Sequence, residues 1–488
     1  MKNFAAPAAL IAAILASAIS MIDGTAVNVS LPIIQRDLHA SSAEIQWVVE
    51  GYALFVSALL LAGGALGDRY GRRLLFIIGT ATFALGSIAC ALATNAEMLV
   101  TARCIQGVGG ALMIPESLAL ITAAYDEATR GRAIGTWSAA SAMTTMLGPV
   151  LGGWLTQHIS WRAIFLINVP LAIAVLFITA AWVQESRDDA ESADRPDVPG
   201  ALLATLALGA LVFGLIRFQN VGADLDALAP IVAGVILFAL FFAVERKTKS
   251  PMLRLDLFAS KTFVLANVFT LLMYAALGGA LFFVPFYLIN VDRYSPTAAG
   301  AALLPTVVII ALFSRNAGAL ADRIGARMPL IAGALIAAAG FALFGLIGTS
   351  AGYWATVFPA ALTLGIGAAL FVAPLTTSVM NAAPQSESGS AAGINNAVSR
   401  VAGLLAIAIL GIVVVSVTGS HLAGTTLPSR DALFSGSVPQ GLGPAAAAAF
   451  HRAYAAGFEA AMLSGAALAL LAALSAWWLP VRSVTPRT

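Results

Sequence analysis

The chain has 488 residues, of which 60% are apolar and only 10% are charged, and its formal net charge is +2. Soluble domains are about half apolar and about a quarter charged, so this composition excludes an ordinary water-soluble protein. The chain also lacks the basic stripe expected of a nucleic-acid-binding protein. Its two cysteines and four histidines show no metal-ligand spacing, so no metal site is expected.

Apolar runs of about 20 residues recur along the whole chain, and each is long enough to cross a bilayer as a helix. The sequence therefore predicts an all-α integral membrane protein with fourteen transmembrane helices. The first run is too long for a cleaved signal peptide, so we expect it to be retained. In chain order the predicted spans are 8–29, 44–66, 74–94, 98–122, 133–157, 163–183, 199–218, 227–245, 262–290, 297–320, 329–349, 354–379, 390–417 and 453–479.

Two polar segments divide these spans into groups of six, two and six. We expect an N-terminal six-helix bundle at 1–184, a cytoplasmic linker at 185–198, a two-helix insertion at 199–245, a second cytoplasmic linker at 246–261 and a C-terminal six-helix bundle at 262–488. An even number of spans places both termini on one side. If that side is the cytoplasm, the inner loops hold most of the Lys and Arg residues, as the positive-inside rule requires.

The longest predicted loop is 418–452, which is rich in Ala, Gly, Ser and Pro. A composition of this kind is typical of a mobile connection between spans. We therefore expect 418–452 to be a mobile outer loop.

One short sequence occurs twice. Residues 64–73 read GALGDRYGRR, and residues 318–327 read GALADRIGAR. In each copy a long apolar run meets a short basic turn, which indicates an internally repeated membrane protein. The repeat predicts two pseudo-symmetric bundles.

Ionisable side chains inside a span are unfavourable by several kcal/mol, so each is a functional candidate. Asp23, Glu50 and Arg103 lie near the same end of their predicted spans, at depths of about 8–9 Å for a rise of 1.5 Å per residue. We expect them to form one polar cluster able to exchange protons. The alternative is a structural ion pair that only holds the three helices together.

Other polar groups inside the spans are candidate substrate contacts. Gln46 and Glu50 share a helical face with Ser57, and such a stripe indicates water or polar partners rather than lipid. Arg400 lies near the middle of its predicted span and is expected to line a cavity. Glu116 is a candidate substrate contact or inner gate, although it could instead reach the headgroups or form a hydrogen bond beside Pro115.

Five motifs follow one another at the corresponding spans. They are DGTAVNVSLP at 23–32, the first copy of the repeat at 64–73, RCIQG at 103–107, GPVLGG at 148–153, and the pair WR at 161–162 with NVP at 168–170. On these motifs the chain resembles the major facilitator superfamily, specifically its fourteen-span drug:proton antiporter subfamily (EmrB/QacA type). Two positions depart from the usual pattern, since Thr144 replaces a glycine and Glu116 replaces a small or neutral residue.

The resemblance implies two six-helix bundles around a central cavity that opens alternately to each side. It implies proton coupling through Asp23, Arg103 and Glu50, and a gating role for both copies of the repeat. In that role Asp68 would cap the start of the helix at 390–417. Tight packing between spans 4 and 5 would limit leakage. The implied gating residues are Gly64, Asp68, Arg69, Gly71, Arg72, Arg73, Asp322, Arg323, Gly148, Pro149, Gly152 and Gly153.

The leading hypothesis is export of hydrophobic or cationic drugs, driven by the proton gradient without another cofactor. The alternative is an exporter or importer of one defined metabolite, such as a sugar, amino acid, siderophore or endogenous antibiotic.

No phosphate-binding loop of the Gly-x-x-x-x-Gly-Lys-Ser/Thr type is present, and no nucleophile–base or metal cluster indicates an enzyme. Expected partners are a small-molecule substrate and the lipid bilayer of the inner (cytoplasmic) membrane, with a periplasmic adaptor and an outer-membrane channel as further candidates.

Overall fold

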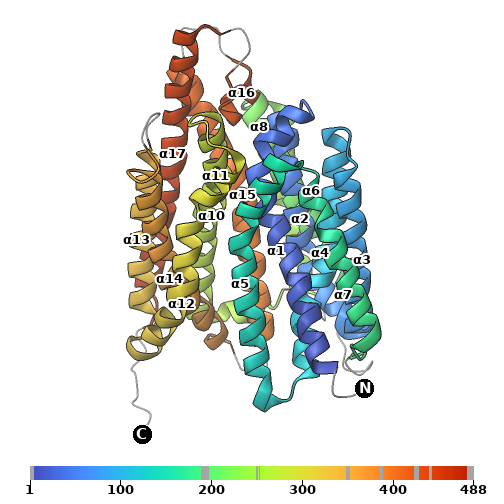
Figure 1. The fold of residues 1–488 in the computed structure, drawn as a ribbon. Coiled ribbons are helices and arrows are strands. Elements are labelled where there is room, and N and C mark those ends of the chain that lie inside the picture. The colour runs from blue at the N-terminus through green and yellow to red at the C-terminus, as the bar shows by residue number, and fades with distance from the viewer. Residues whose placement is uncertain are drawn as a thin grey trace. The chain divides into compact units, whose positions relative to one another are not determined.

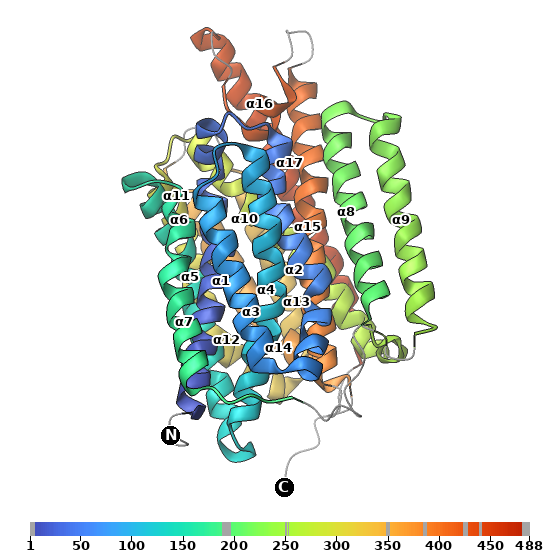
Figure 2. The same ribbon diagram turned by 90° about the vertical axis from the view of Figure 1, so that its right-hand side faces the viewer.

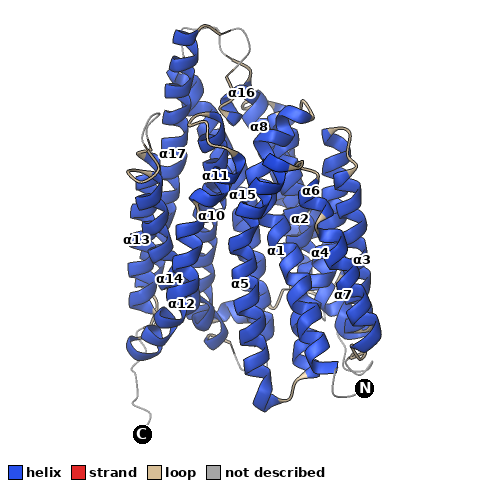
Figure 3. Cartoon of the chain, in the orientation of Figure 1, coloured by secondary structure: helices blue, strands red, loops and turns tan. Residues whose placement is uncertain are grey.

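The protein is described from a computed structural model, which covers residues 5–187, 197–248, 251, 253–347, 352–383, 388–422, 428–438 and 442–480. Within these ranges the regular elements are helices, and no strand occurs (Figure 3). This confirms the all-α prediction. Its physical basis is that a lipid core contains no water to satisfy exposed backbone groups, so each span satisfies its own.

The helices appear in the order in which the apolar runs predict them (Figure 1). The N-terminal part contains α1 (Ala5–Asp37), α2 (Ser42–Tyr70), α3 (Arg72–Ala91), α4 (Ala96–Ala124), α5 (Glu127–His158), α6 (Ala163–Leu166), α7 (Asn168–Trp182), α8 (Val198–Val221) and α9 (Leu225–Glu245). The remainder contains the 3₁₀ helix η2 (Leu255–Ala259), α10 (Lys261–Asn290), α11 (Pro296–Ala302), α12 (Leu304–Ile324), α13 (Arg327–Gly345), α14 (Val357–Asn381), α15 (Ser388–His421), α16 (Arg430–Ser435) and α17 (Pro444–Trp477).

Within the described residues, 13 helical segments are long and apolar enough to cross a membrane. Two of them join short helices to longer ones, as Ala163–Trp182 and Pro296–Ala321. Helix α5 is not among the 13, although it coincides with the predicted span 133–157. It is rich in Thr, Ser and Gly, which makes it less apolar than its neighbours. The membrane class is therefore confirmed, and the count of fourteen stays a prediction.

The chain forms two compact units. The first comprises Met1–Gly214 and Ala223–Leu253, and the second comprises Leu215–Gly222 and Arg254–Thr488. Most of the two-helix insertion thus groups with the first unit, where α8 and α9 form a hairpin (Figure 2). The hairpin is closely packed, since a side chain at Gly214 would meet the backbone nitrogen of Ile231 at 2.8 Å.

The two copies of the repeat form the same local structure. Helix α2 ends at Gly71, whose N–H donates to the carbonyl of Gly67 at 2.9 Å, and α12 ends at Gly325, whose N–H donates to Ala321 at 2.8 Å. Both terminal glycines have positive φ, 120° and 85° respectively. Residues with a side chain rarely adopt that conformation, so the glycine ends the helix in each copy.

Helix α4 packs against α1, α2 and α3 within the first unit. Its glycines allow this close approach, because a side chain on Gly107 would meet the carbonyl oxygen of Tyr52 in α2 at 2.7 Å. On the α3 side, a side chain at Gly109 would overlap the backbone of Phe83. Glycines of α4 therefore allow a close approach to α2 and α3, as is usual for membrane helices.

Gly148 and Gly152 of α5 face α1 rather than α4. A side chain at Gly148 would overlap Thr25, and one at Gly152 would lie 2.6 Å from the Cα atom of Ala26. Gly153 is also buried, and α5 continues through Pro149 without interruption. The prediction that these glycines pack spans 4 and 5 against each other is therefore wrong. Helices that are adjacent in sequence need not turn their glycine-bearing faces toward each other.

The segment 418–452 contains more helix than expected. Helix α15 extends to His421, α16 forms within the segment, and α17 begins at Pro444. Proline at the first helical position and the alanines that follow it favour this early start. In the second unit, Asn290 donates from Nδ2 to the Ser435 carbonyl at 2.6 Å, and the Tyr454 hydroxyl donates to the Phe434 carbonyl at 3.1 Å. These bonds hold α16 in place, so part of 418–452 is regular helix, and the mobility of this loop stays a prediction.

Replacing Gly152 with alanine should destabilise the protein by about 1–3 kcal/mol, because the added Cβ has no space against α1. The matched control is Gly135→Ala in the same helix, where nothing lies within 4 Å of an added Cβ. That control should be neutral or stabilising by up to about 1 kcal/mol. Thermal unfolding in detergent measures both changes, and equal melting temperatures for the two variants would contradict this packing.

Asp292 lies in the turn after α10, outside the predicted spans, and neither carboxyl oxygen has a hydrogen-bond partner in the described structure. Burial raises the pKa of Asp292 from 3.8 to about 6. The folded state therefore holds this proton more tightly than the unfolded state does. Between these two pKa values the unfolded state loses its proton first, so the free energy of unfolding decreases as the pH rises.

Asp292→Asn removes the free-energy cost of ionising a buried carboxyl, so it should stabilise the protein at neutral pH by about 1 kcal/mol. This value is smaller than the full pKa shift implies, because the carboxyl is only partly shielded from water. The gain should shrink as the pH falls from about 6 to about 4 and should vanish below about 4, where Asp292 is neutral in both states. Melting temperatures of both proteins across this pH range test the effect. A difference in melting temperature that does not change with pH would contradict this effect of Asp292.

Candidate functional site

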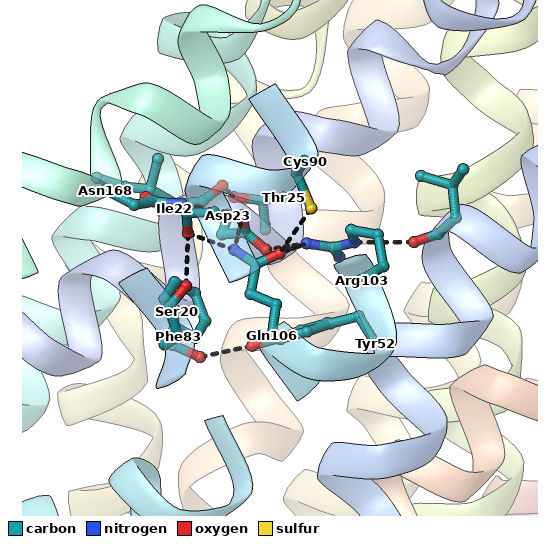
Figure 4. Close-up of polar contacts among 12 residues, drawn as sticks. Ser20, Ile22, Asp23, Thr25, Tyr52, Phe83, Cys90, Arg103, Gln106 and Asn168 are labelled. Atoms are coloured by element: carbon teal, nitrogen blue, oxygen red, sulfur yellow. Dashed lines mark hydrogen bonds and ion pairs between the residues drawn. The ribbon is translucent and has the colours of Figure 1, made fainter. Parts of the chain in front are cut away.

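Asp23 of α1 and Arg103 of α4 form a buried ion pair inside the first unit (Figure 4). Arg103 donates from Nη1 to Oδ2 of Asp23, and the two side chains are 1% and 0% exposed respectively. Both residues were predicted from the sequence to meet at one depth. The structure brings them together, and their role in proton coupling stays a proposal.

The Asp23 carboxylate receives two further donors. Gln106 Nε2 and Asn168 Nδ2 donate to Oδ1 at 2.9 and 3.1 Å, and the same two nitrogens also lie 2.9 and 3.3 Å from the hydroxyl of Ser87 (Figure 4). A buried charge is tolerated when it is paired and its remaining lone pairs are hydrogen-bonded. Residues from α1, α3, α4 and α7 thus combine to hold one ionised carboxylate.

Arg103 has partners besides Asp23. Its Nε donates to the Val48 carbonyl at 2.9 Å, and its Nη1 also donates to Gln106 Oε1 at 2.7 Å. The guanidinium lies 4.4 Å from the ring centroid of Tyr52, a cation–π geometry. The cation therefore keeps two hydrogen bonds and an aromatic contact if Asp23 accepts a proton.

No role was predicted from the sequence for Gln106, Asn168, Ser87 or Tyr52. Two signals were present, because Gln106 belongs to the motif at 103–107 and Asn168 opens the motif at 168–170. An Arg and a Gln three residues apart share a helix face, so Gln106 could have been assigned to the same site. Nothing in the local sequence indicated that α3 supplies Ser87.

Glu50 does not join this cluster. It is fully buried, and neither carboxyl oxygen has a hydrogen-bond partner among the described residues. Val48 and Tyr52 are the α2 residues that contact Arg103, and Glu50 lies about 200° around the helix from Val48. The expectation of a three-residue cluster was therefore wrong for Glu50, because the rise per residue gives height but not direction.

The other candidate contacts lie in different surroundings. Gln46 and Ser57 are buried like Glu50, so their shared face does not point to lipid. Arg400 lies in α15 and is half-buried. Glu116 is buried between α4 and Gly67 of α2 without a hydrogen bond in the described structure, so it neither reaches the headgroups nor bonds beside Pro115.

The first copy of the repeat forms a bonded turn. Arg72 donates to Asp68 from Nε at 2.8 Å and from Nη2 at 2.6 Å. Arg73 donates to the carbonyls of Thr179 and Ala180 at the end of α7, at 3.1 and 2.7 Å. Arg73 therefore caps a neighbouring helix.

Glu185 completes the turn from the segment after α7. Its carboxylate accepts the backbone N–H groups of Arg73 and Leu74 at 2.9 and 3.2 Å, at the start of α3. A carboxylate is favourable at this position because a helix N-terminus carries unsatisfied N–H groups and a partial positive charge. The same carboxyl would lie 2.7 Å from a side chain at Gly71, so this glycine also provides space.

The remaining predicted gating residues make fewer contacts. Arg69 lies beside the ring of Tyr70, with 5.8 Å between the guanidinium and the ring centroid. In the second copy Arg323 is exposed, and the side chain of Asp322 lies outside the described residues. The side chains at the start of α15, which Asp68 was expected to cap, also lie outside the described residues.

The chain is similar to known membrane proteins over most of its length. The model of the Major Facilitator Superfamily matches residues 13–407. The chain is 37% identical over 409 residues to the multidrug resistance protein Stp of Mycobacterium tuberculosis (strain CDC 1551 / Oshkosh), covering 83% of this chain and 75% of that protein. It is 36% identical over 400 residues to the tetracenomycin C resistance and export protein of Streptomyces glaucescens, covering 82% and 74%.

Two further comparisons agree with these. The chain is 35% identical over 408 residues to the methylenomycin A resistance protein of Bacillus subtilis (strain 168), covering 83% of this chain and 85% of that protein. Its fold is similar to a bacterial homologue of the human lysosomal transporter Spinster, with a TM-score of 0.70, 16% identity, and coverage of 97% and 96%. The chain therefore belongs to the major facilitator superfamily, and it is a multi-pass membrane transporter rather than an enzyme.

Proposed function

We propose that this protein exports hydrophobic or cationic compounds in exchange for protons by alternating access. We place it in the fourteen-span drug:proton antiporter subfamily, in the cytoplasmic membrane with both termini in the cytoplasm. The names of the relatives, which concern multidrug resistance and antibiotic export, support the substrate class. A periplasmic adaptor and an outer-membrane channel are expected only if the cell has an outer membrane.

One observation carries the proposal of proton coupling, namely the buried Asp23–Arg103 pair with its neutral donors. A fully paired carboxylate is stable as an anion, and it becomes a proton acceptor when its donors move away. Arg103 stays charged throughout and keeps its contacts with Val48 and Tyr52. Movement of α1 relative to α4 would thus change the proton affinity of Asp23 without leaving an isolated cation.

Glu50 is the proposed second acid. Its carboxyl is buried without a hydrogen-bond partner among the described residues, so its ionised form is unfavourable unless water or a cation reaches it. A cationic substrate would supply that missing charge. We therefore propose Glu50 with Gln46 and Arg400 as substrate contacts. Proton loss at Glu50 would accompany binding of a cationic compound.

A second candidate function is export of one defined antibiotic or metabolite. It is favoured by relatives that are named for single compounds, tetracenomycin C and methylenomycin A. A panel of compounds in sealed vesicles with an imposed pH gradient separates the two functions. Transport of several unrelated compounds supports the drug exporter, and transport of one compound supports the narrow exporter.

Asp23→Asn should abolish proton-driven efflux while the protein still inserts and binds substrate, because asparagine cannot carry the coupled proton. One charge crossing about 100 mV supplies about 2.3 kcal/mol, so the variant should lose a concentration ratio of about fifty-fold. Vesicle efflux with and without a pH gradient measures this loss.

The matched control is Asp37→Asn, since Asp37 also lies on α1 and pairs with an arginine, Arg162, at 3.0 Å. The Asp37 side chain is 49% exposed, so it is not a candidate for buried coupling. This control should retain efflux. Undiminished active transport by Asp23→Asn would refute the coupling role, and loss of folding and binding together would favour the structural ion pair.

Asp68→Asn should slow turnover with little change in substrate affinity or stability, because a surface ion pair of this kind contributes only about 0–1 kcal/mol. Asp256→Asn is the control, because Asp256 pairs with Arg254 at 2.8 Å in a similarly exposed setting. Turnover in exchange assays and binding by titration separate these effects. Normal turnover of Asp68→Asn would count against gating by this turn.

A further inference from the structure

The carboxyl group of Glu116 occupies an unusual position between α2 and α4. Glu116 is only 1% exposed, and neither of its carboxyl oxygens has a hydrogen-bond partner among the described residues. Its carboxyl lies directly against the Cα atom of Gly67, so a side chain at Gly67 would overlap the carboxyl carbon and both oxygens. The contact lies within the first unit.

Gly67 is the last of three glycines in the C-terminal half of α2 that contact α4. A side chain at Gly63 would overlap the carbonyl of Ala111, whereas one at Gly64 would touch Pro115 at 3.6 Å. We call Gly63, Gly64 and Gly67 the glycine groove. Close helix packing explains the glycines themselves. It does not explain an acid at the end of the groove, where an apolar side chain would avoid burying polar atoms.

Three charged groups act on Glu116 through their electrostatic fields, namely Asp68, Arg72 and Glu185. Two of them are carboxylates, and the cation among them, Arg72, donates from Nε and Nη2 to Asp68. An ionised Glu116 would therefore lack both water and a hydrogen-bond donor, in a setting with two like charges. Burial of such an ion is unfavourable by several kcal/mol, so this packing requires the neutral acid.

We propose that Glu116 is a second proton-exchanging site. It must be protonated for α4 to pack into the glycine groove, and it releases its proton when water enters between α2 and α4. The site is distinct from Asp23, because Glu116 and Arg103 are about 20 Å apart along α4. The inference rests on the proposed proton-coupled export for its role in transport, although the link between protonation and helix seating is independent of the substrate.

Infrared spectroscopy of the purified protein provides a direct test, because a protonated carboxylic acid has a C=O stretch that disappears on ionisation. The wild type should show such a band persisting to a higher pH than the bands of exposed carboxyls. Glu116→Gln should remove it. Glu50→Gln is the matched control, since Glu50 is also buried without a hydrogen bond, and it should remove a different band. A spectrum unchanged by Glu116→Gln would overturn the proposal.

Gly67→Ala tests the same site if Glu116→Gln does not fold. The added methyl group should push the carboxyl of Glu116 out of the groove, so its band should be lost at the lower pH typical of exposed acids. Gly64→Ala is the control, because its added Cβ makes only an ordinary contact at 3.6 Å. A band that titrates at the same pH in Gly67→Ala as in the wild type would contradict the assignment.

Transport measurements separate this inference from the proposed function. Glu116→Gln should slow proton-driven efflux several-fold and flatten its pH profile, while substrate exchange at equal pH continues. A merely structural role would lower efflux without changing the shape of the profile, and that result would overturn the proposal. The infrared band should persist in Asp23→Asn, so a failure of coupling at Asp23 would be recognised separately from a failure at Glu116.

Discussion

The unfavourable free energy of an unpaired charge in an apolar medium is the constraint on which this structure depends. It separates the acids of the first unit into two classes. Asp23 accepts hydrogen bonds from three donors, whereas Glu50 and Glu116 are buried without hydrogen bonds in the described structure. A small change in helix packing would alter either environment, because it would remove the donors of Asp23 or admit water to Glu50 and Glu116.

Helix α4 connects these two classes of acid. Near its N-terminal end it carries Arg103 and Gln106, which bind Asp23, and near its other end it carries Glu116. Its glycines and those of α2 and α3 allow backbone contact along most of this length. A closely packed helix moves largely as a unit. Displacement of α4 would therefore affect both sites together, which is a physical route by which proton exchange at one site could be linked to the other.

The turn at 64–73 belongs to the same arrangement. Arg72 holds Asp68, and Arg73 caps the end of α7. Glu185 then caps the start of α3 from the segment that follows α7. These bonds join the ends of α2, α3 and α7 close to the groove where Glu116 lies. The basic residues of this motif therefore do more than determine orientation in the membrane, since they set the local geometry of three helices.

The sequence by itself determined the helical membrane fold, because each apolar run is a local property that lipid converts into a helix. It also determined the repeated helix ends at Gly71 and Gly325 and the height shared by Asp23 and Arg103. Only the tertiary structure decided which side chains meet. It added Gln106, Asn168 and Ser87 to Asp23, excluded Glu50, turned the glycines of α5 toward α1, and placed Glu116 against Gly67. The physical reason is that height follows from counting residues along one helix, whereas contact also requires the rotation of that helix and the identity of its neighbours.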